Sequence, residues 1–428
     1  GRALPVATGA SEGRSDPVRR TTPSHFPAYA LFAAMLATAG LPIYIHAPKF
    51  YVDTYGVSLS ALGAVLFGLR LLDVVQDPLL GRLSEVLRYR RALAVALAAV
   101  LMAAAMVGLF AVEPLMPPLA WFALMLALVF SGFSFLTICF YAQGVARAEG
   151  VASGHLALAR WRETGALLGV CAASVAPVVL GIWLARPFAG FAVGFAALTA
   201  SAVWAMRREW TASGVTAPVG FSVILRDGPA RRLLLIALVN AAPVAVSSTL
   251  FLFFVESALA APGWEGPLLL LFFLSAAAAA PGWGMAAERF GARRTLLTAM
   301  VLAITAFGSA LFLKPGDVAL FAVICVVSGA AVGADLTLLP AMFARRMAVI
   351  APTAAEGFGL WSFVSKVALA FAAVVLLHAL DRAGFEGGGA SNPALALNVL
   401  TWLYAGVPCV LKLCAIWLLA RADNLEDS

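Results

Sequence analysis

The feature that most constrains this chain is a succession of apolar stretches, each about 20 residues long. About 20 apolar residues in a helix span the hydrocarbon core of a bilayer, whereas the strands of membrane barrels are shorter and alternate in polarity. Of the 428 residues, 62% are hydrophobic and only 12% are charged, whereas about 25% are charged in a typical soluble domain. The sequence therefore predicts an all-α integral membrane protein.

We expect twelve transmembrane helices. Their approximate bounds are 26–47, 58–80, 92–112, 118–142, 164–185, 187–206, 232–255, 266–286, 295–313, 317–341, 355–380 and 394–419.

The basic residues indicate how these spans are oriented. Of the 29 lysines and arginines, 22 fall on the side that also holds both termini and four on the other, while Arg70, Lys366 and Lys412 lie within spans. Cytoplasmic loops carry the excess of positive charge. Both termini are therefore expected in the cytoplasm, and the location expected is a bacterial inner (plasma) membrane. The basic clusters lie between spans, which favours topology over nucleic-acid binding, and we expect a monomer.

The remaining composition gives few further sites. Residues 1–25 and 421–428 are predicted to be cytoplasmic tails, the first of them disordered because it lacks an apolar run. The five cysteines have no paired spacing and the four histidines form no ligand cluster. We expect no resident metal or cofactor. No nucleophile motif, nucleotide-binding loop or dinucleotide fingerprint is present, so an enzyme is not expected.

A repeat lies in two cytoplasmic loops. The stretches "DPLLGRLSEVLRYRRAL" (77–93) and "APGWGMAAERFGARRTL" (280–296) align without a gap at an offset of 203 residues. The aligned pairs include Pro78 with Pro281, Gly81 with Gly284, Glu85 with Glu288, Arg90 with Arg293 and Arg91 with Arg294. The repeat predicts an N-terminal six-helix bundle over 26–206, a cytoplasmic connector over 207–231 and a C-terminal six-helix bundle over 232–420.

This Gly-xxx-acid…Arg-Arg loop resembles the loop motif of the major facilitator superfamily. The resemblance implies two bundles that rock against each other to give alternating access to a central cavity. Small glycines let helix ends approach, and the acids and arginines are expected to pair across the seam between the two halves.

One span carries a charged face. In "RLLDVVQDP" (70–78), Arg70, Asp73 and Asp77 are spaced i, i+3 and i+7, so a helix places them on one side. Ionisable groups within the bilayer face a protein interior or a watery cavity. Lys366, in the eleventh span, is expected to face this side. Two carboxylates and one ammonium leave one spare negative charge, which a monovalent cation can fill.

Four stretches are similar to the glycoside–pentoside–hexuronide:cation symporters, the melibiose-permease group. They are 70–78, "FYVDTYGVS" (50–58), "SKVALAFAA" (365–373) and "LLPAMFAR" (338–345). The resemblance implies that Asp73 and Asp77 bind the coupling cation, Na⁺ or H⁺, with Arg70 and Lys366 as charge partners. It places a functional arginine at Arg162 or at Arg160. Sodium-dependent lysolipid transporters share the aspartates and the lysine, so the motif identifies the coupling site rather than the cargo.

The chain departs from the melibiose-permease pattern where that group binds sugar. Ala37, Thr137 and Ala344 occupy positions where the group has acidic residues. Residues proposed for the substrate cavity are Thr137, Tyr141, Arg162, Asn240, Asp335 and Trp361.

The sequence predicts a cation-coupled symporter of a small solute, with a sugar or glycoside as first candidate. A lysolipid or other amphiphile is the alternative cargo. A non-transporting assembly factor or sensor on the same fold is the alternative class of protein. For Asp73 and Asp77, the alternative to cation binding is a structural ion pair with Arg70 or Lys366.

Overall fold

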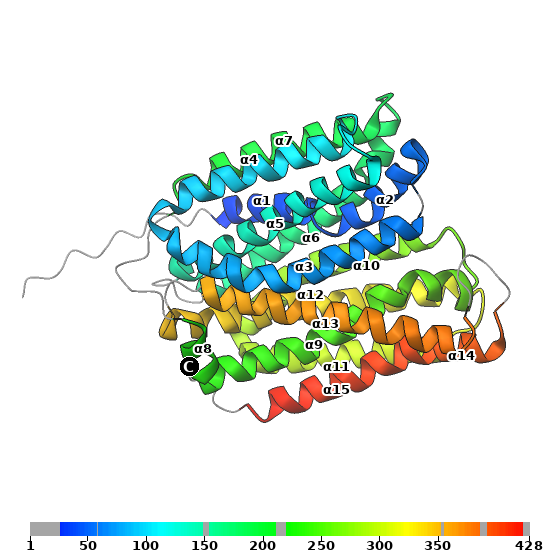
Figure 1. Cartoon of the computed structure of the whole chain (residues 1–428). Helices are drawn as coiled ribbons and strands as arrows, with labels where there is room; N and C mark the ends of the chain where they lie inside the picture. Colours follow the sequence, from blue (N-terminus) through cyan, green and yellow to red (C-terminus); the bar gives the residue numbers. More distant parts are fainter. Residues whose placement is uncertain are drawn as a thin grey trace, which may run out of the picture.

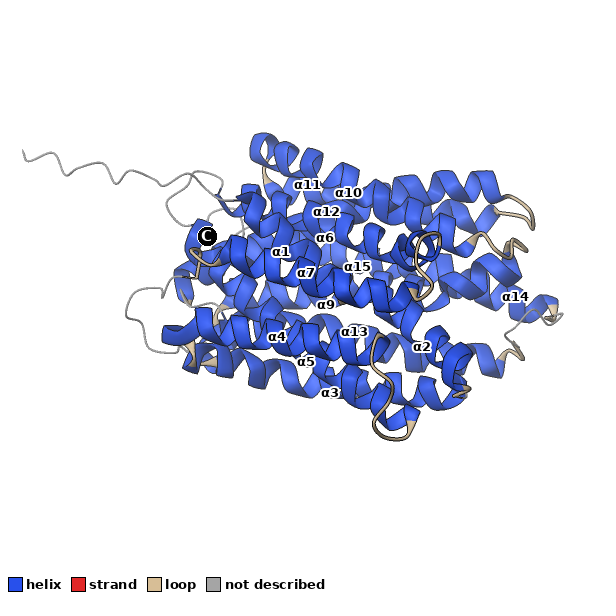
Figure 2. Ribbon diagram, turned by 90° about the horizontal axis from the view of Figure 1, so that it is seen from above, coloured by secondary structure: helices blue, strands red, loops and turns tan. Residues whose placement is uncertain are grey.

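The computed structural model describes residues 26–57, 59–148, 154–210, 220–351, 355–385 and 392–422. Within these ranges the chain forms helices joined by turns and contains no strand. The tail predicted over 1–25 and residues 423–428 of the second tail lie outside the described residues. Figures 1 and 2 show long helices that run along one common direction.

Two groups of helices lie one over the other in Figure 1. The first group contains α1 (Phe26–Thr38), α2 (Leu41–Tyr55), α3 (Leu59–Val86), α4 (Arg91–Phe110), α5 (Pro118–Ala148), α6 (Gly154–Gly181) and α7 (Pro187–Met206). The second contains α8 (Phe221–Arg226), α9 (Gly228–Phe253), α10 (Glu265–Phe290), α11 (Ala292–Ser309), α12 (Val318–Ile350), α13 (Ala355–Arg382), α14 (Ala394–Thr401) and α15 (Val407–Ala420). The N-terminal end of α1 and the C-terminal end of α15 lie at the same end of the bundle, on the left of Figure 1.

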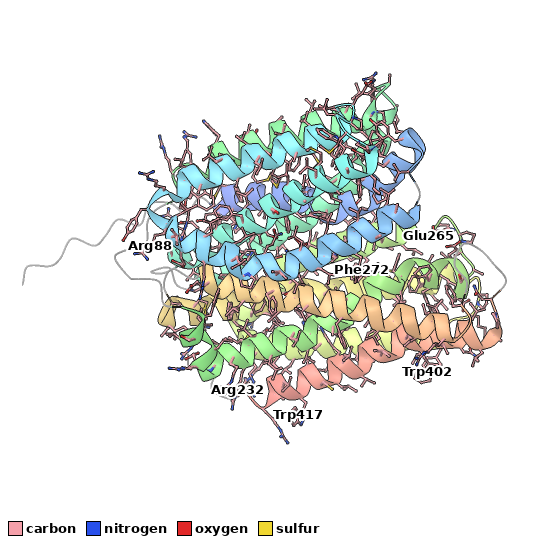
Figure 3. The ribbon with its side chains drawn as sticks, viewed as in Figure 1. Arg88, Arg232, Glu265, Phe272, Trp402 and Trp417 are labelled. Carbon is pink, nitrogen blue, oxygen red and sulfur yellow. The ribbon has the colours of Figure 1, made fainter. Side chains whose placement is uncertain are left out.

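Nine helices within the described residues are long and apolar enough to cross a membrane. Helix α3, which carries Arg70, Asp73 and Asp77, and helix α13, which carries Lys366, are not among the nine. The count of twelve spans fits this arrangement and stays a prediction. In Figure 3, Arg88 and Arg232 lie at one end of the bundle and Glu265 at the other.

The first expected span differs from the structure. The single helix predicted over 26–47 is two helices, α1 and α2, with a break at residues 39–40. Pro42 has no N–H to donate to the carbonyl of Thr38, so the helix loses a hydrogen bond where it breaks. Helix α2 then continues to Tyr55 and is followed by Gly56, whose φ of +65° ends a helix without strain.

The second half begins at a capped helix. Asp227 accepts a hydrogen bond from the backbone N–H of Ala230 at 2.9 Å and one from Arg346 Nε, also at 2.9 Å. Helix α9 therefore begins at Gly228, four residues before the start of the predicted span. The hydrogen bond from Arg346 lowers the pKa of Asp227. The ionised Asp227 therefore stabilises the folded protein at pH values above its unfolded pKa of about 3.9. This stabilisation is lost as the pH falls through the lower pKa that Asp227 has in the folded protein.

Glycines permit the closest helix contacts. A Cβ added at Gly169 in α6 would lie 2.5 Å from the carbonyl oxygen of Ala34 in α1, and one at Gly165 would lie 2.2 Å from that of Ala30. Gly329 in α12 meets α10 in the same way. Small residues at four-residue spacing let membrane helices approach until their backbones touch.

We expect Gly169→Ala to destabilise the protein, because the added methyl group meets backbone atoms that cannot rotate away. Overpacking of this kind costs about 1–3 kcal/mol, and thermal unfolding of the purified protein measures it. Gly194→Ala in α7 is the control, since nothing lies within 4 Å of its Cβ position, and it should be neutral or stabilising. Equal midpoints for the two variants would contradict the close packing of α1 on α6.

Candidate functional site

An ion pair joins the two halves of the protein. Asp77 of α3 is fully buried, and Lys366 Nζ of α13 lies 3.0 Å from its Oδ2 atom and 3.1 Å from its Oδ1 atom. The same nitrogen lies 3.7 Å from Oδ1 of Asp73. Helices α3 and α13, far apart in the sequence, lie side by side in Figure 1. The structure thus brings Lys366 together with Asp73 and Asp77, which the sequence placed in another span.

Hydroxyl and amide groups hold this cluster in place. Ser362, one helical turn before Lys366, donates to Asp77 Oδ2 at 2.5 Å. Lys366 also donates to Ser134 of α5 at 2.7 Å. These bonds orient both charged groups from three helices.

A second chain of hydrogen bonds reaches Asp73. Ser131 of α5 donates to the side-chain oxygen of Gln76 at 2.9 Å, and the amide nitrogen of Gln76 donates to Asp73 Oδ1, also at 2.9 Å. Every group that bonds the two carboxylates in these networks is a donor, so their oxygens are the negative centre of the site.

The charges of Asp73, Asp77 and Lys366 alone do not cancel, whereas with Arg70 the four charges sum to zero. Asp73 and Asp77 bring two negative charges and Lys366 one positive charge, and Asp73 and Asp77 are buried. Arg70, one turn before Asp73, is half-buried and acts on Asp73 electrostatically. A small cation close to both carboxylates would share their negative charge with the two basic residues.

Two glycines bring α3 and α13 close together beside the ion pair. A Cβ added at Gly359 would lie 3.1 Å from the carbonyl oxygen of Asp77 and 3.3 Å from Cα of Gly81. A Cβ at Gly81 would in turn lie 3.2 Å from the carbonyl oxygen of Ala355. The backbones of α3 and α13 therefore approach each other closely at this point. This short separation allows Lys366 of α13 to reach Asp77 of α3.

The acids of the sequence repeat cross the seam next to these glycines. Glu85 accepts from the backbone N–H of Ala355 at 3.2 Å. Its repeat partner Glu288 lies 3.9 Å from Arg160 of α6, which packs over Gly284. The aligned Gly and Glu therefore mark two equivalent contacts, of α3 with α13 and of α10 with α6.

The arginines of the repeat act within their own halves. Arg91 is buried and donates to Gln143 at 3.4 Å, whereas Arg90 is exposed. Arg293 donates to the last carbonyls of α15, those of Leu419 at 3.2 Å and Ala420 at 2.5 Å, and Arg294 is exposed. Across the seam, the contacts described above involve the acids of the repeat.

A second polar cluster lies in the first half. Arg162 is buried, donates to Glu163 at 2.7 Å and stacks 3.9 Å from the ring centre of Tyr141. Its Nη2 atom and the hydroxyl of Thr137 are buried without a hydrogen-bond partner.

Aromatic rings of α13 lie beside this cluster. Tyr141 packs on Phe358 with ring centres 5.0 Å apart, and Trp361 packs on Phe343 with ring centres 4.9 Å apart. Of the two arginines left open by the sequence, Arg160 lies at the seam and Arg162 in this interior.

Asn240 and Asp335 lie elsewhere, in the second half. Lys412 of α15 bonds both of them, Asn240 at 2.6 Å and Asp335 in a short ion pair. Sequence reasoning placed Lys412 within a span but gave it no role. Like Lys366, it is a basic residue inside an apolar run, and that signal alone would have singled it out. Ser134 and Ser362 carry no comparable signal, because serines are common in membrane helices.

Comparisons with known proteins bear on the family and the fold. A sequence model of the family described as MFS/sugar transport protein matches residues 27–424. No curated protein sequence matches the chain.

Three solved structures illustrate the structural likeness. A bacterial homologue of the iron transporter ferroportin, in an outward-facing state, has a TM-score of 0.69 at 12% identity, covering 93% of this chain and 99% of that one. The human organic anion transporter MFSD10 has a TM-score of 0.63 at 15% identity, covering 94% and 100%. The E. coli fucose:proton symporter FucP has a TM-score of 0.58 at 14% identity, covering 91% and 98%. At such identities the likeness concerns the fold alone, and it confirms the all-α transporter fold expected from the sequence.

Because Lys366 neutralises a buried carboxylate, Lys366→Met should destabilise the protein by about 3–5 kcal/mol. The double variant Lys366→Met/Asp77→Asn should recover much of this loss, since the carboxylate closest to Lys366 is then neutral. Denaturant or thermal unfolding of the four proteins of the cycle gives the coupling. Lys314→Met, at an exposed loop position, is the control and should be neutral. Additive effects of the two changes would show that the pair does not couple the halves.

Proposed function

Since the chain belongs to the MFS/sugar transport protein family, we propose that it is a cation-coupled symporter of a small solute, a sugar or glycoside, that works by alternating access. The coupling ion is Na⁺ or H⁺. The observation that carries the proposal is the cluster of Asp73, Asp77 and Lys366, because it combines a spare negative charge with a bond between the two halves.

A cation acts on this cluster by competing with Lys366. Hard cations prefer carboxylate and other oxygen ligands, and two carboxylates with adjacent hydroxyl and amide oxygens supply them. A cation held between Asp73 and Asp77 weakens the hold of Asp77 on Lys366, because the carboxylate charge is then shared. A proton on either acid has the same effect. Occupancy of the site therefore changes how strongly α3 holds α13.

Alternating access follows from where this bond lies. The contacts of Glu85, Glu288 and Gly359 close the seam at the end of the bundle that holds Arg88. By the distribution of basic residues this end is cytoplasmic, so the conformation described here is closed to the cytoplasm. Solute and cation then enter from the outside and are released when the seam opens.

The solute site is proposed at Arg162, Tyr141, Thr137 and Trp361. A hydroxylated solute accepts from the unpaired Nη2 of Arg162 and donates to the unpaired Thr137 hydroxyl oxygen, while aromatic rings offer apolar faces to a sugar ring. No acid stands at Ala37 or Ala344, which favours a solute held by fewer charged contacts than a melibiose-type sugar. The family description and the fucose:proton symporter among structural relatives support a sugar or glycoside.

We expect Asp77→Asn to leave the protein folded and to abolish cation-stimulated uptake. Removing one buried charge spares its desolvation, and Lys366 keeps Asp73 and Ser134 as partners. Since binding of cation and solute is reciprocally linked, solute affinity should become independent of Na⁺ or of pH. Uptake into proteoliposomes, with and without an ion gradient, measures the effect. If the folded Asp73→Asn and Asp77→Asn proteins both show cation-stimulated uptake like the wild type, the cluster does not bind the coupling cation. It is then only a structural ion pair.

The two neighbouring arginines provide a matched test of the solute site. Arg162→Lys keeps the charge but loses the forked donor, so the KM for the solute should rise about tenfold. Arg160→Lys should leave KM unchanged, because Arg160 lies at the seam. The assay is initial-rate uptake by proteoliposomes, first against a panel of sugars, glycosides and lysolipids. Uptake of lysolipid but of no sugar would replace the proposed cargo by an amphiphile.

A further inference from the structure

A cavity of about 220 Å³ lies inside the second half of the protein. Its walls come from α9, α10, α11, α12, α15 and the π-helical turn Trp402–Gly406 between α14 and α15, and from no helix of the first half. Phe272, one of its residues, lies between Arg88 and Glu265 along the length of the bundle in Figure 3. Rocking of the halves therefore does not alternately open this cavity to the two sides of the membrane.

The walls of the cavity are apolar. Six aromatic side chains surround it: Phe251, Phe272, Phe273, Phe307, Phe321 and Tyr404. The serine hydroxyls in the wall donate to carbonyls of their own helices, for example Ser247 to Pro243 at 2.7 Å and Ser328 to Ile324 at 2.6 Å. Tyr404 belongs to the π-helical turn, and such turns occur frequently at functional sites.

One charged residue lines the cavity. Lys412 is 4% exposed, and its ammonium donates to Asp335 and to Asn240. An ammonium has three N–H donors, so one remains beyond these two bonds. The other carboxylate oxygen of Asp335, Oδ1, is buried and has no hydrogen-bond partner. Lys412, a residue of the cavity wall, thus keeps spare donor capacity beside an otherwise apolar cavity, whereas its ion-pair partner Asp335 is not part of that wall.

We propose that this cavity binds a small, neutral alcohol whose apolar part fills the aromatic cavity and whose hydroxyl group bonds Lys412. A hydroxyl oxygen accepts hydrogen bonds, which matches the spare N–H of Lys412 in the cavity wall. The ion pair is already neutral, so a carboxylate or an ammonium would bring an uncompensated charge into the interior. The site is distinct from the proposed cation and solute sites, and its ligand is not cargo.

The volume sets the size of the ligand. An apolar cavity of about 150 Å³ engineered in another protein takes up benzene. A cavity of about 220 Å³ therefore has room for one aromatic ring with a short polar arm, but not for a complete lipid. Benzyl alcohol, toluene and benzoate are matched probes, because they share the ring and differ in the head group.

The test measures binding of the three probes to the full-length protein in nanodiscs, by ligand-detected NMR and by the thermal midpoint. Benzyl alcohol should bind about tenfold more tightly than toluene, since it adds a hydrogen bond to a charged group, and benzoate should not bind. In Lys412→Met/Asp335→Leu, where apolar side chains replace the ion pair, the advantage of benzyl alcohol over toluene should disappear.

Variants that fill the cavity distinguish binding of the probe at this site from partitioning of the probe into the lipid of the nanodisc. Ala303→Leu and Cys325→Leu each place extra carbon atoms in the cavity wall and should abolish binding. Val301→Leu, on the exposed side of the same helix as Ala303, is the control and should bind like the natural protein. Equal signals from the natural and filled proteins, or equal affinities for toluene and benzyl alcohol, would overturn the proposal. The outcome is independent of the Asp77→Asn uptake experiment.

Discussion

The structure depends on the ion pair between Asp77 and Lys366. In this contact a fully buried charge of one half is satisfied by a charge of the other. In an apolar interior a lone carboxylate or ammonium is far more costly than the pair. The two halves are thereby held at a defined separation, and the strength of that hold depends on what else neutralises Asp77. The alternating access proposed here requires such a contact to be strong but replaceable.

The glycines make this contact possible, and the surrounding hydrogen bonds make it specific. Without side chains at Gly81 and Gly359, the backbones of α3 and α13 approach closely enough for Lys366 to reach Asp77. Ser134 and Ser362 then fix the ammonium and the carboxylate. Glu85, one turn beyond Gly81, caps the start of α13. The glycine packing, the ion pair and the helix cap therefore all lie where α3 crosses α13. A change in one of these contacts alters the geometry of the other two.

Much of this arrangement could be predicted from the sequence, because charge in an apolar run is costly and so is informative. The run lengths indicated the helices, and the spacing of Asp73 and Asp77 placed them on one face, as the structure has them. The offset of 203 residues paired Gly81 with Gly284 and Glu85 with Glu288, which occupy equivalent contacts at the seam. Helix breaks were harder, since the hydropathy of the run over 26–47 is continuous and only Gly40 and Pro42 indicate the break between α1 and α2. Partner choice was hardest: nothing local to Arg91 or Arg293 tells which half each side chain bonds.

Two lysine–aspartate pairs illustrate why the same residue types serve different ends. Lys366 and Asp77 come from different halves, and Asp73 gives their cluster a second carboxylate, which is why we propose that a cation competes with the lysine there. Lys412 and Asp335 come from the same half, and Asn240 supplies a neutral third partner. That cluster has no surplus charge for a cation to neutralise, and no movement of one half against the other separates it. Its remaining capacity is for hydrogen bonding, which suits a neutral ligand. Net charge and the placement of partners across the seam, rather than residue identity, decide which pair can couple ion binding to movement.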